Sequence, residues 1–177
     1  GGISIMSSVQ YFDEMLHAEQ VCLHQIAREV GTPFYVYSSY ALQSHYSLLQ
    51  EAFKGVKHLI CFSVKAASNQ AILTTLRQLG AGMDVVSGGE YRRAILAGVD
   101  PNKIIFSGVG KTLEEMELIA DQGVRQVNIE SEQELELLNQ VALTKGSIIP
   151  IAIRVNPDVD AKTNEKIATG KAENKFG

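Results

Sequence analysis

Cysteine is scarce in this chain of 177 residues: Cys22 and Cys61 are the only two, and they stand far apart. No Cys-x-x-Cys spacing exists, so neither a zinc site nor a thioredoxin-like redox motif is indicated. Cys61 lies inside an apolar run, which predicts a small, buried hydrophobic residue. The four histidines share no metal-ligand spacing. Without a disulfide pattern, a reducing, cytoplasmic location is expected.

Long apolar runs and basic clusters are also missing. No stretch approaches the roughly 18 residues of a membrane-spanning helix, and the N-terminus lacks the charged and apolar regions of a signal peptide. The net charge is −4, whereas non-specific nucleic-acid binding needs a positive surface. The sequence therefore predicts neither a membrane nor a nucleic-acid partner. Residues 1–5 are expected to be a tag remnant that precedes a native Met6.

The chain instead shows a repeated alternation of β-rich runs and amphipathic helical stretches. Strands are expected at 59–64, 83–86, 103–106, 126–129 and 148–155. Helices are expected to begin at the three capping boxes 87–90, 112–115 and 131–134, which all read Ser/Thr-x-x-Glu. Helices are expected to end at Gly80, Gly98, Gly123 and Gly146.

This order of strand, cap, helix and glycine is the pattern of a parallel βα sheet, with units of roughly 20–25 residues. Two architectures fit it, a (β/α)8 barrel and a doubly wound open sheet. Five expected strands are too few to close a barrel, so a barrel would be only partly contained in this chain.

A partial nucleotide-binding motif, Gly-Val-Gly-Lys-Thr, occupies residues 108–112 after an expected strand. A P-loop needs a further glycine five residues before the glycine of Gly-Lys-Thr. Ile105 stands there, inside the strand. The motif therefore disfavours a nucleoside triphosphatase, and Lys111 and Thr112 are expected to lead into a helix.

Lys65 ends the apolar run 58–64. The C-terminal end of a buried strand is where barrel enzymes place their chemistry, and lysine forms a Schiff base with pyridoxal phosphate (PLP). The alternative is a lysine that covers the strand end and extends into water. The local context alone favours this alternative, because most lysines are solvated.

Five further motifs change that balance. They are GMDVVSGGE at 82–90, IFSGVGK at 105–111, NIES at 128–131, RVNP at 154–157, and TG at 169–170 followed by NKFG at 174–177. With FSVKAASN around Lys65, their order and spacing resemble the N-terminal part of the diaminopimelate decarboxylases. The resemblance extends from about Thr32 to the last residue. SGVGK and NKFG separate this family from the ornithine and arginine decarboxylases.

The resemblance implies an α/β fold: part of a PLP-binding (β/α)8 barrel of the alanine-racemase type, with a C-terminal β domain outside this chain. Residues 6–37 would lead into the barrel, and 38–177 would form about five βα units that end in the active-site loop. The implied reaction is decarboxylation of meso-2,6-diaminopimelate to L-lysine and CO2, a step of lysine biosynthesis. Lys65 would be the catalytic lysine that binds PLP, and Asp84 and Arg154 would be further cofactor-binding residues.

Structural roles compete with these assignments. Glu90 is expected to be the third-position glutamate of a capping box, and Asp84 could be only a polar strand end. Arg154 needs a partner if it is buried. Glu130 and Ser131 are expected to cap the next helix rather than to face the site.

Two positions depart from the family pattern, Ala67 in place of asparagine and Asn164 where a histidine is usual. The chain also stops at Gly177, before later family motifs. A barrel that ends after its fifth strand leaves an open edge, so the chain is not expected to fold alone.

We expect the remainder of the enzyme to be a second polypeptide, cut in an exposed loop near Gly177. The resemblance further implies a homodimer. Alternatives are a decarboxylase of another basic amino acid, a racemase, a non-catalytic PLP-binding barrel, or an inactive truncated product.

Overall fold

The structure is a computed structural model that describes residues 8–159, 162, 165–173 and 176–177. The chain forms two compact units, which meet in the sequence between His58 and Leu59 and are described separately. Three assignments made from the sequence lie outside the described residues: the tag remnant at 1–5, the departure at Asn164, and residues 174–175 of the NKFG motif.

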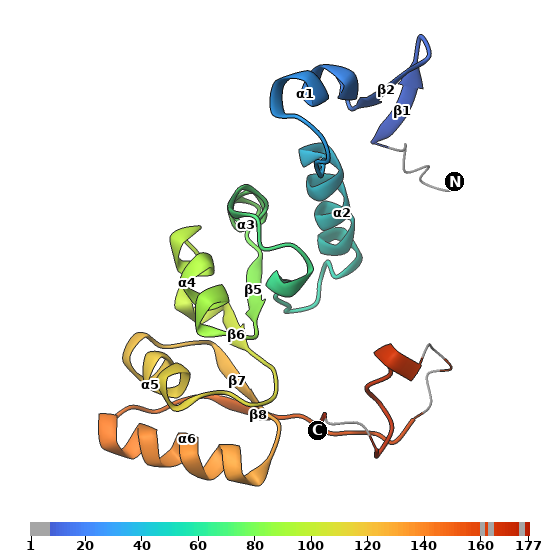
Figure 1. The fold of residues 1–177 in the computed structure, drawn as a ribbon. Helices are drawn as coiled ribbons and strands as arrows, with labels where there is room; N and C mark the ends of the chain where they lie inside the picture. The colour runs from blue at the N-terminus through green and yellow to red at the C-terminus, as the bar shows by residue number, and fades with distance from the viewer. Residues whose placement is uncertain (1–7, 160–161, 163–164, 174–175) are drawn as a thin grey trace. The chain divides into compact units, whose positions relative to one another are not determined.

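The first unit contains a small antiparallel sheet and two helices (Figure 1). Its elements are β1 (Val9–Phe12), β2 (Met15–Ala18), β3 (Val21–Cys22), α1 (Leu23–Val30) and α2 (Ser39–Ala52). Asp13 and Glu14 form the turn between β1 and β2, both with positive φ. Sequence analysis assigned no strands here, because such a turn is usually signalled by Asn-Gly or Asp-Gly.

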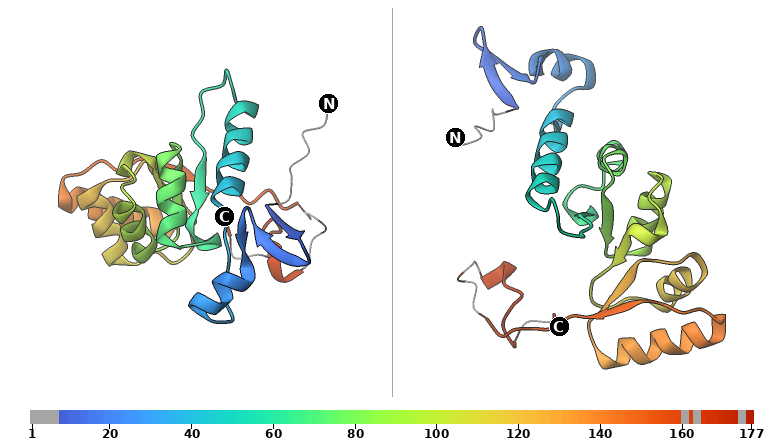
Figure 2. Two further views of the ribbon diagram at one scale, coloured as in Figure 1. Left: turned by 90° about the horizontal axis from the view of Figure 1, so that it is seen from above. Right: turned by 180° about the vertical axis from the view of Figure 1, so that it is seen from behind.

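The second unit is a five-stranded parallel sheet with helices between the strands (Figures 1 and 2). Its strands are β4 (Cys61–Ser63), β5 (Gly82–Val85), β6 (Ile104–Phe106), β7 (Gln126–Ile129) and β8 (Ile151–Ile153). Its α-helices are α3 (Gln70–Gln78), α4 (Gly88–Leu96), α5 (Leu113–Gln122) and α6 (Glu132–Lys145). Its short 3₁₀ helices are η1 (Val64–Ala66), η2 (Pro101–Lys103) and η3 (Glu165–Ile167).

The predicted parallel βα sheet is confirmed, and the strand order decides between the two architectures. The strands lie in the order β4-β5-β6-β7-β8, which is their order in the sequence. A doubly wound sheet reverses direction at a switch point, whereas a barrel does not. The second unit therefore has the winding of a barrel.

The two faces of this sheet differ in composition. Alternate residues point to one face, which the helices cover, with α4 against β5 and β6 and α6 against β7. On this helix-covered face five side chains are fully buried: Met83, Val85, Ile104, Phe106 and Val127. The opposite, open face carries half-buried and mostly polar residues, including Ser63, Asp84, Ser107, Gln126 and Asn128.

Cys61 lies on this open face, in register with Gly82. It is half-buried, and its Sγ lies 3.9 Å from the main-chain oxygen of Lys103. Burial, and secondly the negative charge of Asp84, raises the pKa of the Cys61 thiol. The prediction of a buried residue is wrong, because the apolar run around Cys61 supplies residues to both faces of the strand.

The helix starts follow the predicted caps only in part. The side chains of Ser87, Thr112 and Ser131 each accept the backbone N–H of the glutamate three residues on. Only Thr112 has the reciprocal bond, from Glu115, that completes a capping box. The carboxylate of Glu90 instead accepts the N–H of Val86, at 2.8 Å. At Ser87 and Ser131 the helix therefore has the side-chain N-cap but not the reciprocal bond from the glutamate that a capping box requires.

The predicted helix ends are confirmed by their backbone geometry. Positive φ angles occur at all four predicted glycines, Gly80, Gly98, Gly123 and Gly146. Gly146 caps α6 in the left-handed conformation, with φ 63° and ψ 29°. An L-residue with a side chain is disfavoured in that region, so glycine is the natural residue there.

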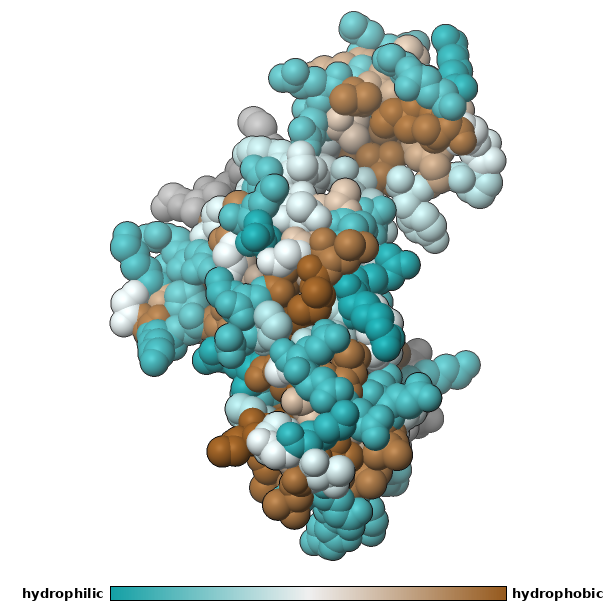
Figure 3. Space-filling model, turned by 90° about the vertical axis from the view of Figure 1, so that its left-hand side faces the viewer, coloured by the Kyte–Doolittle hydropathy of each residue, from teal (hydrophilic) through white to brown (hydrophobic). Residues whose placement is uncertain are grey.

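Several apolar side chains of the second unit reach the surface, as the brown areas in the lower part of Figure 3 show. Leu143, Ile148 and Ile153 are each at least 70% exposed. Within the described residues, no helix is both long and apolar enough to cross a membrane.

Candidate active site

Lys65 lies in η1, directly after β4, and its side chain is exposed at the carboxyl edge of the parallel sheet. The backbone is held on both sides of it. Val64 is fully buried, and the side chain of Asn69 caps α3 by accepting the N–H groups of Ala71 and Ile72. In parallel βα folds this edge carries the binding and catalytic groups.

Asp84 is the carboxylate of β5 on the open face. Ser63 of β4 donates to its Oδ2 at 3.1 Å, and Ser107, just after β6, donates to its Oδ1 at 2.5 Å. Both carboxylate oxygens therefore accept a hydroxyl from a neighbouring strand. Since Ser63 is the last residue of β4 and lies two residues before Lys65, Asp84 is tied to the strand that leads to the lysine.

The hydrogen bonds continue across the open face beyond Ser107. Asn128 Nδ2 donates to Ser107 Oγ, and Gln126 Nε2 donates to Asn128 Oδ1, both at 2.9 Å. Ser107 lies in the SGVGK motif and Asn128 in NIES, but sequence reasoning did not assign them to the site. Their order in the motifs was visible, whereas their contact depends on the register of β6 and β7.

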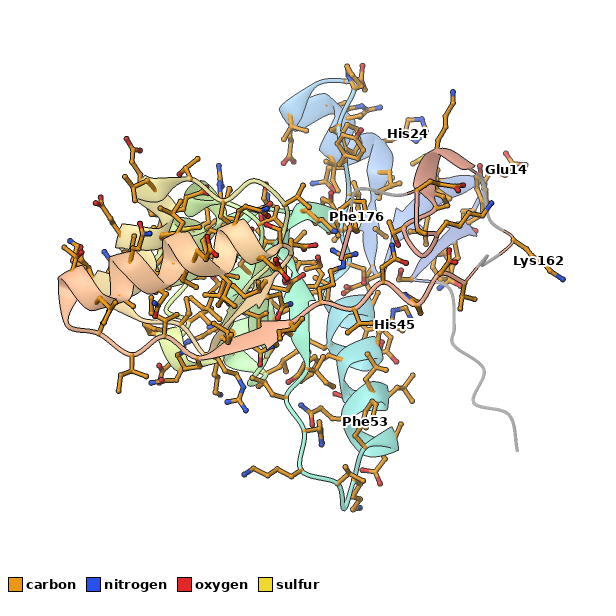
Figure 4. All side chains as sticks on the ribbon, turned by 90° about the horizontal axis from the view of Figure 1, so that it is seen from below. Glu14, His24, His45, Phe53, Lys162 and Phe176 are labelled. Carbon is orange, nitrogen blue, oxygen red and sulfur yellow. The ribbon has the colours of Figure 1, made fainter. Side chains whose placement is uncertain are left out.

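Arg154 follows β8 and forms an ion pair with Glu130, Nη1 to Oε1 2.9 Å. The Glu130 side chain is only 4% exposed. The guanidinium also lies over the ring of Phe176, 4.6 Å from its centroid; Phe176 is labelled in Figure 4. Glu130 was expected to cap α6, and this is wrong: Ser131 supplies the side-chain cap, and the Glu130 carboxylate is held by Arg154.

The last residues of the chain lie beside this ion pair. Gly177 N donates to Glu130 Oε2 at 3.3 Å, and Asn156 Nδ2 donates to the main-chain oxygens of Lys171 and Phe176. Asn156 of the RVNP motif thus holds Phe176, in the second half of the NKFG motif. The partnership joins positions about 20 residues apart in the sequence, and no local pattern signals such a long-range contact.

Lys111 is buried, which sequence reasoning missed. Its Nζ donates to the main-chain oxygens of Gly108 and Asn128, both at 2.7 Å, and to Glu134 Oε1 at 2.8 Å. The side chains of Lys111 and Glu134 are 1% and 7% exposed. The chain enters α5 here as expected, with Thr112 as the N-cap, and Lys111 in addition ties the ends of β6 and β7 to α6.

The structure brings some predicted site residues together and separates others. Asp84 is linked to the strand of Lys65 through Ser63. Arg154 follows β8, which lies four strand positions from β4. The hydrogen bonds and ring contact described for Arg154 go to Glu130 and Phe176, and none joins it to Asp84 or Lys65 within the described chain.

The strands of this parallel sheet follow one another in sequence order, which is the winding of a β/α-barrel domain. The exposed Lys65 lies at the edge of the sheet where such domains carry their chemistry. Residues 40–177 match the family described as pyridoxal-dependent decarboxylase, pyridoxal binding domain, and the chain belongs to this family. The resemblance stated from the motifs is confirmed. PLP is the cofactor of this family, and the exposed amine of Lys65 has the chemistry needed to hold it.

Individual relatives agree with this family. A diaminopimelate decarboxylase of Pseudomonas aeruginosa is 49% identical over 172 residues, which cover 97% of this chain and 41% of the relative. The crystal structure of the Helicobacter pylori diaminopimelate decarboxylase complexed with L-lysine has a TM-score of 0.85 at 42% identity, covering 88% of this chain and 39% of that one. The M. jannaschii enzyme, also with L-lysine, gives 0.87 at 37% identity, with coverages of 97% and 41%. The chain thus spans about two fifths of the length of these relatives.

Proposed function

We propose that this chain is the N-terminal part of a PLP-dependent carboxy-lyase that converts meso-2,6-diaminopimelate to L-lysine and CO2. The observation that carries the proposal is the exposed Lys65 at the carboxyl edge of β4, in a chain 49% identical to a diaminopimelate decarboxylase. Two similar structures with that name were solved with L-lysine, the product of the proposed reaction. This favours diaminopimelate over other basic amino acids, and a decarboxylase over a racemase or a non-catalytic barrel.

Lys65, Asp84 and Arg154 are the residues proposed to serve the cofactor. Lys65 would hold PLP covalently through Nζ, and the same amine would move a proton when substrate occupies the site. Asp84 would place a fixed negative charge beside β4, because two hydroxyl groups hold its carboxylate. Arg154, held in place by Glu130, would contribute a positive charge from the end of β8. PLP supplies an electron sink for the bond that breaks when CO2 leaves.

The proposed partners follow from the share of the relatives that the chain represents. The chain covers 41% of the Pseudomonas relative, and within the described residues β8 pairs only with β7. We propose that the remainder of the enzyme, on the same or a second polypeptide, completes the barrel beside β8. A homodimer and a cytoplasmic location complete the proposal.

The test combines covalent trapping with an assay. The protein, combined with the remainder of the enzyme, is incubated with PLP, reduced with borohydride and mapped by mass spectrometry. We expect one pyridoxyl-phosphate adduct on Lys65 that disappears in Lys65→Ala. Lys103→Ala is the matched control, because Lys103 is an exposed lysine at the opposite, amino edge of the sheet.

Carbon dioxide release is then measured with meso-diaminopimelate, ornithine and arginine. We expect release from diaminopimelate alone, and its loss in Lys65→Ala. An adduct confined to another lysine would contradict the proposed site. Release from ornithine or arginine but not from diaminopimelate would contradict the proposed substrate.

A further inference from the structure

We infer that Ser107 and Asn128 are positioning residues that orient Asp84 through a hydrogen-bond chain running in one direction across the open face. This inference rests on the proposed function, because it gives Asp84 a role at the PLP site. It adds two residues to that site which the motif comparison did not assign.

Elementary donor and acceptor counting sets the direction of the chain. An ionised carboxylate only accepts, so the single hydroxyl proton of Ser107 points to Asp84. Ser107 Oγ must then accept from its other neighbour, which is the Nδ2 of Asn128. The Oδ1 of Asn128 is left as an acceptor and receives the Nε2 proton of Gln126. Each bond requires the next, and all of them point to Asp84.

Ser63 completes the restraint from the other side. It donates to Oδ2 of Asp84, while Ser107 donates to Oδ1. Bonds at both oxygens fix the plane of the carboxylate, and hydrogen bonds to an ionised group are stronger than neutral ones. The carboxylate is therefore held between β4, which leads to Lys65, and β6.

The hydrogen-bond chain is anchored to the interior at Asn128. The main-chain oxygen of Asn128 accepts from the buried ammonium of Lys111 at 2.7 Å. The backbone of Asn128 is thus fixed while its side chain bonds along the open face. Since Ser107 and Asn128 are half-buried, truncating either leaves no cavity in the packed core. An effect on the cofactor is then separable from an effect on folding.

The inference predicts that Ser107 and Asn128 affect PLP binding only through the orientation of Asp84. In the PLP-loaded protein combined with the remainder of the enzyme, Ser107→Ala and the nearly isosteric Asn128→Asp should each weaken PLP binding about tenfold, the order expected for one hydrogen bond to a charged group. The dissociation constant is measured by titrating the visible absorption of bound PLP. Ser107→Thr keeps the hydroxyl and should restore the wild-type affinity and absorption maximum. Thr144→Ala, which removes an exposed hydroxyl of α6, is the matched control.

The decisive comparison is a double-mutant cycle with Asp84→Asn. Ser107→Ala should have no further effect on PLP affinity in the Asp84→Asn background. A tenfold effect that persists there would overturn the inference, and so would an unchanged affinity in Ser107→Ala itself. Unfolding midpoints close to wild type in Ser107→Ala and in Asp84→Asn would confirm that the change in PLP affinity does not come from a loss of folding.

A second readout needs no cofactor. The side-chain amide protons of Asn128, assigned by nuclear magnetic resonance, should exchange slowly with solvent and should lose that protection in Ser107→Ala. Fast exchange in the wild-type protein would contradict the hydrogen-bond chain itself. Protection without a PLP adduct on Lys65 would instead contradict the proposed function, so the two failures are distinguishable.

Discussion

The two faces of the parallel sheet use the same strands for different purposes. On the helix-covered face, Met83, Val85, Ile104 and Phe106 are fully buried. One residue along, the open face carries half-buried polar residues such as Asp84 and Ser107, bonded to each other. Because side chains alternate along a strand, a single substitution changes one face and leaves the other in place.

The energies of the two faces differ accordingly. Burial of a large apolar side chain contributes roughly 1.5–3 kcal/mol, whereas a typical hydrogen bond contributes about 0.5–1.5 kcal/mol net. Most of the stability of the second unit should therefore come from the helix-covered face. The open face can then carry reactive groups whose replacement costs little stability.

The largest expected effect tests this division directly. Phe106→Ala should lower the free energy of unfolding by about 3–5 kcal/mol, because it leaves a cavity among buried side chains. Ser107→Ala, at the next residue, should lower it by about 1 kcal/mol or less. Urea denaturation measures both. Similar losses for the two variants would break the comparison between the faces.

Lys111 is a polar residue that should behave like a core residue. Lys111→Met removes one partner of a buried ion pair and leaves Glu134 uncompensated, so a loss of about 3–5 kcal/mol in unfolding free energy is expected. Lys111→Met combined with Glu134→Leu should recover much of it. Lys145→Met breaks the half-exposed pair with Asp121 and should cost less than about 1 kcal/mol. A Lys111 variant as stable as the Lys145 variant would contradict the buried pair.

Two buried or half-buried groups of the second unit should make its stability depend on alkaline pH: Tyr91 in α4 and Cys61 on the open face. Burial raises the pKa of Tyr91 of α4 above 10.0 and that of Cys61 above 9.0. For a raised pKa the folded state keeps the proton longer, so stability is complete below the unfolded value and falls as pH rises through the folded value. Tyr91→Phe should flatten the decline above pH 10.0, and Cys61→Ala the decline that starts near pH 9.0.

The measurement is urea denaturation as a function of pH, with each variant compared with wild type at neutral pH. Tyr91→Phe should also lose about 1 kcal/mol there, because its hydroxyl donates to the main-chain oxygen of Gly123. An alkaline decline of wild-type slope in both variants would assign the titration to other groups.

The smallest effect concerns a helix start outside both faces. Thr112→Ala removes the capping box of α5 and should cost about 1 kcal/mol. Thr112→Ser, which keeps the hydroxyl, is the control and should be close to wild type by thermal unfolding. A larger loss would show that Thr112 does more than cap α5.

Local signals predicted much of the second unit. Runs of β-branched residues located all five strands, and the caps at Ser87, Thr112 and Ser131 located three helix starts, since each signal lies within a few residues. The strands β1 and β2 escaped because the turn at Asp13 and Glu14 lacks the usual glycine.

The candidate site was less accessible to sequence reasoning. Lys65 was found through a motif resemblance, because its local context alone favours a solvated lysine. The pairs Lys111–Glu134 and Arg154–Glu130 join residues more than 20 positions apart. Such contacts depend on strand register and on which loop ends meet at the sheet edge, and no short pattern encodes them.

The sequential strand order has a consequence for how the protein is made. Each strand from β5 to β8 pairs with the strand synthesised just before it, so the four pairings of this sheet within the described residues join consecutive βα units. Short-range contacts favour fast folding, and chains emerge from the ribosome N-terminus first. The sheet can therefore grow one βα unit at a time during translation, and the neighbourhood of Lys65 takes shape as soon as β5 and β6 have emerged.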